Sequence, residues 1–527
     1  MTLPEIAGHH EDPNEHVSRR SRSFSPRLSV ILLGVILAAL LALPGATVTT
    51  KYVNDLFIFL DGAYRILQGQ VPNIDFHTSL GPIAFYLPAF GLGVTGQMGG
   101  AMPVGMALAV LVLAVIAAEI ITGRMRSIIG VPLALFLLLG VAAPSNTGEG
   151  VGELSFAMFY NRLGWTSLGL LIVMYLPRHD GVRRDLPDAL CATVLVLLMT
   201  YTKITYGLVE LAFLVFLLFD PRQRRWVAIS LGLTVASVLI IESFWGGGLN
   251  HIADLRLASD VSGGLPTLRT LGDVVLRNLP DVAIYAIFAL LLLWLRRRLC
   301  DLLFVGFCAG GGVMIIEQNF QIIGIVTLGA SAAVIAELLT SSNFPARQAA
   351  AARGLPLLLA ALLLPAAAVN ATNLSMHAFY GLSTRGEPVP LPAFQNIRLL
   401  PMWSEGQFAT FQRYNASLAD GAGALAALGE APERVAVLDF VNPFSAGMTL
   451  PPPVGDSTWY HWGRTLNREH HPKPQDFFAD VRLILDPKSP IEAWTANGMR
   501  DIYADYIAHN FQLAVETEHW RVYRRRS

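Results

Sequence analysis

Charged residues and cysteines are both scarce in this chain of 527 residues. Asp, Glu, Lys and Arg make up 15% of it, whereas soluble domains contain about 25%. Hydrophobic residues account for 53%, and the mean hydropathy is +0.49, which indicates an integral membrane protein. The three cysteines all lie in apolar runs, so no disulfide framework is predicted. A net charge of -1 gives no reason to expect nucleic-acid binding.

Long apolar runs are present instead, and they predict the architecture. About eleven of them approach the length needed to cross the hydrocarbon core, which takes about 20 helical residues. We therefore predict a polytopic α-helical membrane protein with about eleven transmembrane helices. The runs lie near Leu28–Thr47, Met102–Thr122, Ser127–Ala143, Leu163–Leu176, Ala189–Lys203, Ile204–Phe219, Trp226–Trp245, Pro280–Leu295, Leu302–Ile316, Phe320–Leu339 and Leu355–Val369.

The arginines predict the orientation, because short Arg-rich connections stay in the cytoplasm. They all fall on one side if Pro82–Thr95 lies at the membrane interface or is re-entrant. The N-terminus is then inside and the C-terminus outside, in a bacterial-type inner membrane. The arginines concerned are Arg19, Arg20, Arg22, Arg27, Arg124, Arg126, Arg178, Arg183, Arg184, Arg222, Arg224, Arg225, Arg296, Arg297, Arg298, Arg347 and Arg353.

Three parts of the chain follow from this pattern. Residues 1–27 form a polar tail that we expect to be cytoplasmic and disordered. Residues 28–372 form the transmembrane domain, with a long first outer loop at 48–101. Residues 373–527 are predicted to form a periplasmic α/β domain, because ERVAVLDF and DVRLILDP resemble buried strands and Ile491–His509 has helical periodicity.

The C-terminal part contains no Gly-rich phosphate loop, no G-x-S-x-G elbow and no CxxC pair. Asp439, Asn442 and His461 lie near predicted strand ends, and we interpret them as turn and cap residues. The aromatic stretch Thr458–Trp462 suits a domain core or the membrane interface, or a surface on which a sugar stacks.

The first outer loop gathers carboxylates beside the first apolar run, where they are costly unless they have a function. Asp55 lies among aromatic residues, which raise the pKa of a carboxyl group, and a raised pKa suits a general base. Alternatively, Asp55 caps a helix. Asp61 and Arg65 have the spacing of an ordinary helix-surface pair. Asp75 and His77 form an Asp-x-His pair that we expect to contact the substrate, and two ligands do not complete a metal site.

Isolated cations are predicted on the same side of the membrane. Arg162 follows a short polar loop that contains Glu149 and Glu153. Lys203 lies between two apolar runs among Thr and Tyr residues. A cation at such a depth favours an anionic partner such as a lipid phosphate, although snorkelling to the interface explains Arg162 equally well.

The first loop also resembles a known family. It has the early Asp55 and Tyr64, followed by the pattern G-Q-x-P-x-x-D-F-x-x-x-x-G-P, which includes Gly69, Pro72, Asp75, Phe76, Gly81 and Pro82. This combination resembles the GT-C superfamily. These are polytopic glycosyltransferases that use polyprenyl-phosphate-linked sugars, with protein mannosyltransferase-like and aminoarabinose-transferase-like members. The predicted architecture resembles that of the family over the whole chain, whereas the sequence motif covers some 30 residues.

The resemblance implies an inverting sugar transfer from a polyprenyl-phosphate donor to a glycan, lipid or protein acceptor. Asp55 matches the family's first-loop base, and Asp75 matches a second acid that supports substrate or a divalent metal. Lys203, Arg162, Glu149 and Glu153 match no family motif, and their expected roles in substrate binding rest on charge and topology alone. The chain departs from many members in having Asn54-Asp55 where they have an acidic pair, which weakens the case for a metal.

Three other functions fit parts of the same pattern. A transporter or flippase would bind lipid-linked saccharides without a base, but the chain has no convincing internal repeat. An O-antigen ligase- or polymerase-type enzyme would use the arginines of the later outer loop, namely Arg256, Arg269 and Arg277. A non-catalytic scaffold would use the C-terminal domain to bind a partner.

Overall fold

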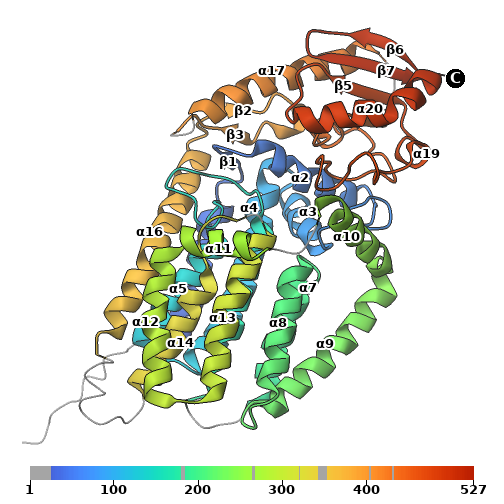
Figure 1. Ribbon diagram of the computed structural model, residues 1–527. Coiled ribbons are helices and arrows are strands. Elements are labelled where there is room, and N and C mark those ends of the chain that lie inside the picture. The colour runs from blue at the N-terminus through green and yellow to red at the C-terminus, as the bar shows by residue number, and fades with distance from the viewer. Residues whose placement is uncertain are drawn as a thin grey trace, which may run out of the picture.

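The computed structural model describes residues 25–179, 184–263, 267–319, 321–341, 353–402, 405–429 and 433–526. The tail expected at residues 1–27 lies almost wholly outside these ranges. Most of the described chain is helical, and a mixed α/β region follows towards the C-terminus (Figure 1).

A helix coincides with each of the eleven apolar runs. Within the described ranges, five helices are long and apolar enough to cross a membrane, namely α4, α9, α12, α13 and α16. The eleven helices are α1 (Pro26–Ala42), α4 (Met98–Thr122), α5 (Ser127–Ala142), α6 (Phe159–Val173), α7 (Asp185–Thr200), α8 (Ile204–Leu217), α9 (Arg224–Trp245), α12 (Leu279–Arg296), α13 (Leu299–Gln318), α14 (Val326–Thr340) and α16 (Leu355–Leu382). The last helix continues past residue 373, where we expected the second domain to begin.

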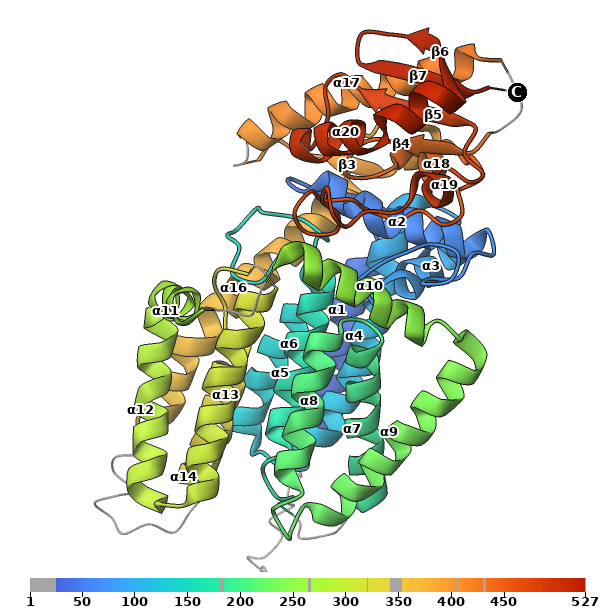
Figure 2. The same cartoon turned by 45° about the vertical axis from the view of Figure 1, so that its right-hand side comes forward.

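Four further helices lie at the end of the bundle nearest the C-terminal region (Figure 2). They are α2 (Val53–Leu67), α3 (Ile83–Thr95), α10 (Gly248–Ser262) and α11 (Leu268–Arg277). The segment Pro82–Thr95 is thus helical, as expected. Helix α2 ends just before Gly69, whose φ of +88° is a conformation that favours glycine.

Gly81 brings the first loop against the turn between α7 and α8. A Cβ at this position would lie 2.2 Å from the carbonyl oxygen of Tyr201. The Gly81 N–H donates to the Thr202 carbonyl at 3.0 Å, and the Ile83 N–H donates to the Tyr201 carbonyl at 2.9 Å. This contact places the residue that follows the turn, Lys203, beside the first loop.

The C-terminal region contains a four-stranded sheet of order β4-β5-β7-β6. Strands β4 and β5 are parallel and the other two pairings are antiparallel. The strands expected at ERVAVLDF and DVRLILDP and the helix expected at Ile491–His509 correspond to β4, β5 and α20. The elements are α17 (Glu405–Ala427), β4 (Val435–Val437), α18 (Pro443–Gly447), α19 (Pro474–Phe477), β5 (Leu483–Pro487), α20 (Ala493–Asn510), β6 (Phe511–Glu516) and β7 (Trp520–Arg525).

Turn chemistry explains two of the polar residues near the strand ends, as expected. Asn442 caps α18, because its Oδ1 accepts from the Phe444 N–H at 3.1 Å. Asp439 accepts three backbone N–H groups, those of Phe440, Ile491 and Glu492. These bonds hold the β4 loop against the start of α20.

The helical bundle and the C-terminal region are joined by a small sheet and by one apolar core. Strand β1 (Thr47–Thr49) pairs in parallel with β3 (Ile397–Leu399), which pairs with β2 (Glu387–Pro388). The 3-10 helix η1 (Pro392–Phe394) stacks Phe394 on Phe57 of α2, with ring centroids 5.0 Å apart. A continuous apolar cluster extends from the bundle to Trp520 in β7. Helix α2 therefore lies between the two regions and packs on both.

Candidate functional site

The proposed base, Asp55, lies in the first turn of α2, where it is half-buried. Burial raises the pKa of its carboxyl to about 7, against a smaller lowering by its own backbone N–H and by the nearby Arg464 guanidinium. Half of the Asp55 side chains would thus be ionised near neutral pH. With a pKa near the working pH, the ionised carboxylate is well populated and is still basic enough to accept a proton readily.

Tyr160 meets Asp55 from the bundle, and Lys203 in turn packs on Tyr160. Tyr160, in the first turn of α6, is close enough to Asp55 and to Arg464 to interact electrostatically with both. The Lys203 ammonium lies over the Tyr160 ring, 5.2 Å from its centroid. Among the described residues, no carboxylate lies within ion-pair distance of Lys203. We call Asp55, Tyr160, Lys203 and Arg464 the Tyr160 cluster.

The C-terminal region supplies Arg464. This residue follows the aromatic stretch Thr458–Trp462 in a tight turn, where its N–H donates to the His461 carbonyl at 2.9 Å. Its side chain is exposed. The cluster therefore combines an acid from α2, a phenol from α6, an ammonium from the start of α8 and a guanidinium from the C-terminal region.

Asp75 and His77 lie outside the Tyr160 cluster. The Asp75 carboxylate accepts from the Val71 N–H at 2.7 Å and so shapes its own loop. His77 Nδ1 lies 2.9 Å from Oδ1 of Asp254 in α10. This hydrogen bond raises the pKa of His77, although burial opposes the shift. Both residues have a structural explanation, and substrate contact by either stays a prediction.

Glu149 and Glu153 form ion pairs with Lys51, a residue that the sequence did not single out. The Lys51 ammonium contacts Glu149 and lies 3.5 Å from Glu153. Burial raises the pKa of Glu149 to about 7 despite the ammonium. These three residues connect the loop before α6 to the segment before α2.

Arg162 is buried in α6, two residues beyond Tyr160. Successive helical residues are rotated by about 100°, so the two side chains point to opposite sides of α6. The Arg162 guanidinium lies over the Phe156 ring, 5.6 Å from its centroid. It lines a cavity that none of the Tyr160 cluster residues lines.

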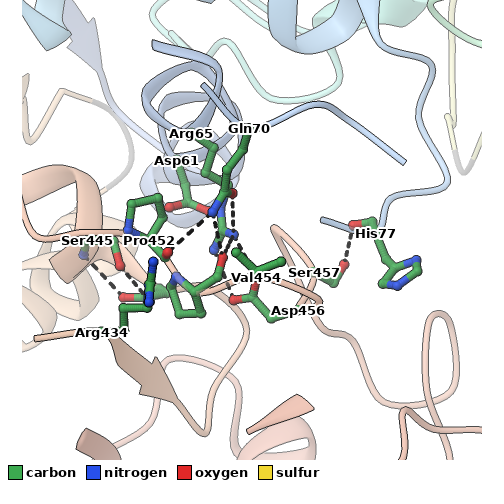
Figure 3. Close-up of polar contacts among 12 residues, drawn as sticks. Asp61, Arg65, Gln70, His77, Arg434, Ser445, Pro452, Val454, Asp456 and Ser457 are labelled. Atoms are coloured by element: carbon green, nitrogen blue, oxygen red, sulfur yellow. Dashed lines mark hydrogen bonds and ion pairs between the residues drawn. The ribbon is translucent and has the colours of Figure 1, made fainter. Parts of the chain in front are cut away.

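The expectation that Asp61 and Arg65 form a surface pair is wrong. The pair exists, with 2.7 Å between Arg65 Nε and Asp61 Oδ2, but both side chains are almost wholly buried. The C-terminal region covers them, because the same guanidinium also binds Asp456 and the Pro453 carbonyl (Figure 3). A partner so distant in the sequence was not visible from local spacing.

Within the described ranges, no group of three or more His, Cys, Asp or Glu side chains is arranged to hold a metal ion. Comparison with protein-family models, curated proteins and solved structures found no match for this chain. The site must therefore be interpreted from its own chemistry.

Proposed function

We propose that the protein is a membrane glycosyltransferase that transfers a sugar, with inversion, from a polyprenyl-phosphate donor to an acceptor hydroxyl. The helices of the bundle then cross the membrane with the N-terminus inside, and the C-terminal region lies in the periplasm. The resemblance of the first loop to the GT-C superfamily supports the same proposal.

One observation carries the proposal: the Asp55 carboxyl and the Lys203 ammonium approach the same phenol, that of Tyr160, from different helices. A sugar transfer from a phosphate needs a base on one reactant and positive charge on the other. The Tyr160 cluster contains both within one small region.

In the proposed reaction, Asp55 accepts the proton of the acceptor hydroxyl while the oxygen of that hydroxyl bonds to the anomeric carbon of the donor sugar. The bond between that carbon and the phosphate oxygen breaks, and the lipid phosphate leaves with the electron pair. Lys203 and Arg464 stabilise the negative charge of the leaving phosphate. The phosphate needs no proton at neutral pH, so one carboxyl suffices.

The arginines that would serve a ligase- or polymerase-type enzyme fit less well. Arg256, Arg269 and Arg277 are all exposed on α10 and α11. None of the three is among the charged groups that interact with Asp55 or Tyr160. A flippase would need no base, so it leaves Asp55 unexplained.

The decisive experiment is mass spectrometry of lipid-linked and cell-surface glycans from cells that lack the protein or produce wild type, Asp55→Asn or Asp260→Asn. Asp260 is an exposed acid of α10 and serves as the matched control. We expect a glycan that wild type and Asp260→Asn produce and Asp55→Asn does not. Identical glycans in cells with and without the protein would refute the proposed function.

A further inference from the structure

The Arg162 guanidinium is buried without a protein partner. The residue is 2% exposed, and none of its three side-chain nitrogens has a hydrogen-bond partner among the described residues. The other buried arginines of the described chain behave differently: Arg65 is bound to Asp61 and Asp456, and Arg124 is bound to Asp188. A buried guanidinium without a counter-charge is costly, so Arg162 has the properties of a ligand-binding group.

Arg162 lines a cavity of about 290 Å³. Helix α16 supplies the largest share of its wall, and α5, α6 and α14 also contribute. Helices α5, α14 and α16 pack together (Figure 1). Most of the lining residues from these helices are apolar, among them Leu137, Leu362 and Ala366. Ser145 adds a polar group to the lining, and its buried hydroxyl also has no partner among the described residues. The cavity is thus polar at one end and apolar along its length.

Two carboxylates line the same cavity, but neither compensates Arg162. Glu149 is paired with Lys51, and Asp281 lies in the first turn of α12. Neither is within ion-pair distance of the guanidinium among the pairs of the described chain. The charge of Arg162 therefore remains available to a ligand.

We propose that this cavity binds a lipid phosphate, with the phosphate on the Arg162 guanidinium and the hydrocarbon chain along α5, α14 and α16. A free anion would make no use of the apolar wall, and a neutral lipid would make no use of the guanidinium. A planar guanidinium matches phosphate oxygens in a bidentate manner. The site is separate from the Tyr160 cluster, since Tyr160 points to the other side of α6. It does not depend on the proposed sugar transfer.

Dodecyl phosphate is a suitable probe, added to the full-length protein in a neutral detergent and followed by native mass spectrometry. We expect one molecule to bind at this cavity, in addition to any bound at the Tyr160 cluster, and Arg162→Met to weaken its binding at least tenfold. Arg256→Met removes an exposed arginine from α10 and should bind as wild type. Unchanged affinity in Arg162→Met would refute the site.

Gly140→Phe tests the hydrocarbon part without changing any charge. Gly140 lines the cavity, and a Cβ there would meet no atom within 4 Å, so the ring can enter the open space. We expect this variant to fold and to bind dodecyl phosphate with an affinity at least tenfold lower than that of wild type. It also keeps the test decisive if Arg162→Met fails to fold, since unchanged binding in Gly140→Phe would refute the proposed position of the chain.

Inorganic phosphate and dodecanol distinguish the two halves of the ligand. At equal concentration, neither should displace dodecyl phosphate from wild type. Displacement by inorganic phosphate would make this a site for a free anion, and displacement by dodecanol would make it a neutral lipid site; either result overturns the proposal. Asp55→Asn should bind dodecyl phosphate as wild type does, whether or not the protein transfers a sugar. A matching loss of affinity in that variant would contradict a separate site.

Discussion

Arg65 and Asp456 form a bidentate ion pair across 391 positions of the chain, with distances of 2.7 Å from Nη1 to Oδ1 and 2.9 Å from Nη2 to Oδ2. Arg65 belongs to α2, which also carries Asp55, and Asp456 belongs to the loop that continues to Arg464. The pair therefore fixes the base and one cation of the Tyr160 cluster relative to each other. Figure 3 shows the two segments meeting at this guanidinium.

We predict that Arg65→Met lowers the free energy of unfolding by about 3–5 kcal/mol, because it leaves two buried carboxylates without a counter-charge. Burial already raises the pKa of Asp61 to about 6 in the presence of Arg65. Thermal unfolding in detergent, followed by fluorescence, measures the loss. Arg468→Met is the matched control: Arg468 pairs with Asp501, but both side chains are more than half exposed, so its loss should cost under about 1 kcal/mol. Equal losses in the two variants would contradict a structural role for the buried pair.

We predict that Asp55→Asn lowers the rate of sugar transfer at least about 100-fold, because general-base catalysis contributes about that much or more. In wild type, activity should rise with pH through about 7 as Asp55 loses its proton. The remaining activity of the variant should lack this pH dependence. Transfer rates measured from pH 5.5 to 8.5 in proteoliposomes test both points, and Asp260→Asn should keep the wild-type profile.

The same pKa makes Asp55 a cost to stability at neutral pH. The pKa of Asp55 is higher in the folded protein than in the unfolded chain. Between pH values of about 4 and 7 the folded state therefore binds more protons than the unfolded state does. The contribution of Asp55 to stability thus falls as pH rises through that window. Asp55→Asn should melt at the same temperature as wild type or higher at pH 7.5. A large loss of stability would mean that the lost activity has a structural cause.

We predict that Lys203→Ala weakens use of the donor more than use of the acceptor. A charge-assisted bond to phosphate is worth about 1.5–3 kcal/mol, so kcat/KM for the donor should fall at least about tenfold. Initial rates with each substrate varied in turn give the comparison. Lys473→Ala removes an exposed lysine before α19 and should leave both values unchanged. Equal losses for donor and acceptor would remove Lys203 from the donor site.

The helices could be predicted from the sequence because each apolar run is a local signal. The start of α2 was equally accessible, since Asp55 was a candidate helix cap and lies in the first turn. Contacts between segments that are distant in the sequence could not be predicted in this way. Nothing near Asp61 in the sequence indicates that Asp456 will cover it, and nothing near Asp55 indicates Tyr160 or Arg464.

Pairing changed the interpretation of several candidate residues for the same reason. Glu149 and Glu153 were visible as acids, but their partner Lys51 lies about 100 positions away, before α2. His77 was visible beside Asp75, but it pairs with Asp254 in α10 instead. Local spacing identifies which residues are unusual, and only the fold decides which of them meet.

We predict that the His77–Asp254 pair stabilises the first loop in acid and less so in base. Asp254 raises the pKa of His77 above that of an ordinary histidine, so the folded state holds the proton more tightly. The stabilisation is complete below a pH of about 6.5, the ordinary pKa of histidine. It is lost as the pH rises through the higher pKa that His77 has in the folded state. Half of the His77 side chain is exposed, so solvent screening limits the effect to about 0.5–1 kcal/mol. His77→Gln should therefore lower the melting temperature by more at pH 6 than at pH 8.5. Because Asp254 also accepts from Asn73 and the Thr78 N–H, the loop should stay folded in the variant. An equal loss at the two pH values would show that the proton on His77 does not contribute.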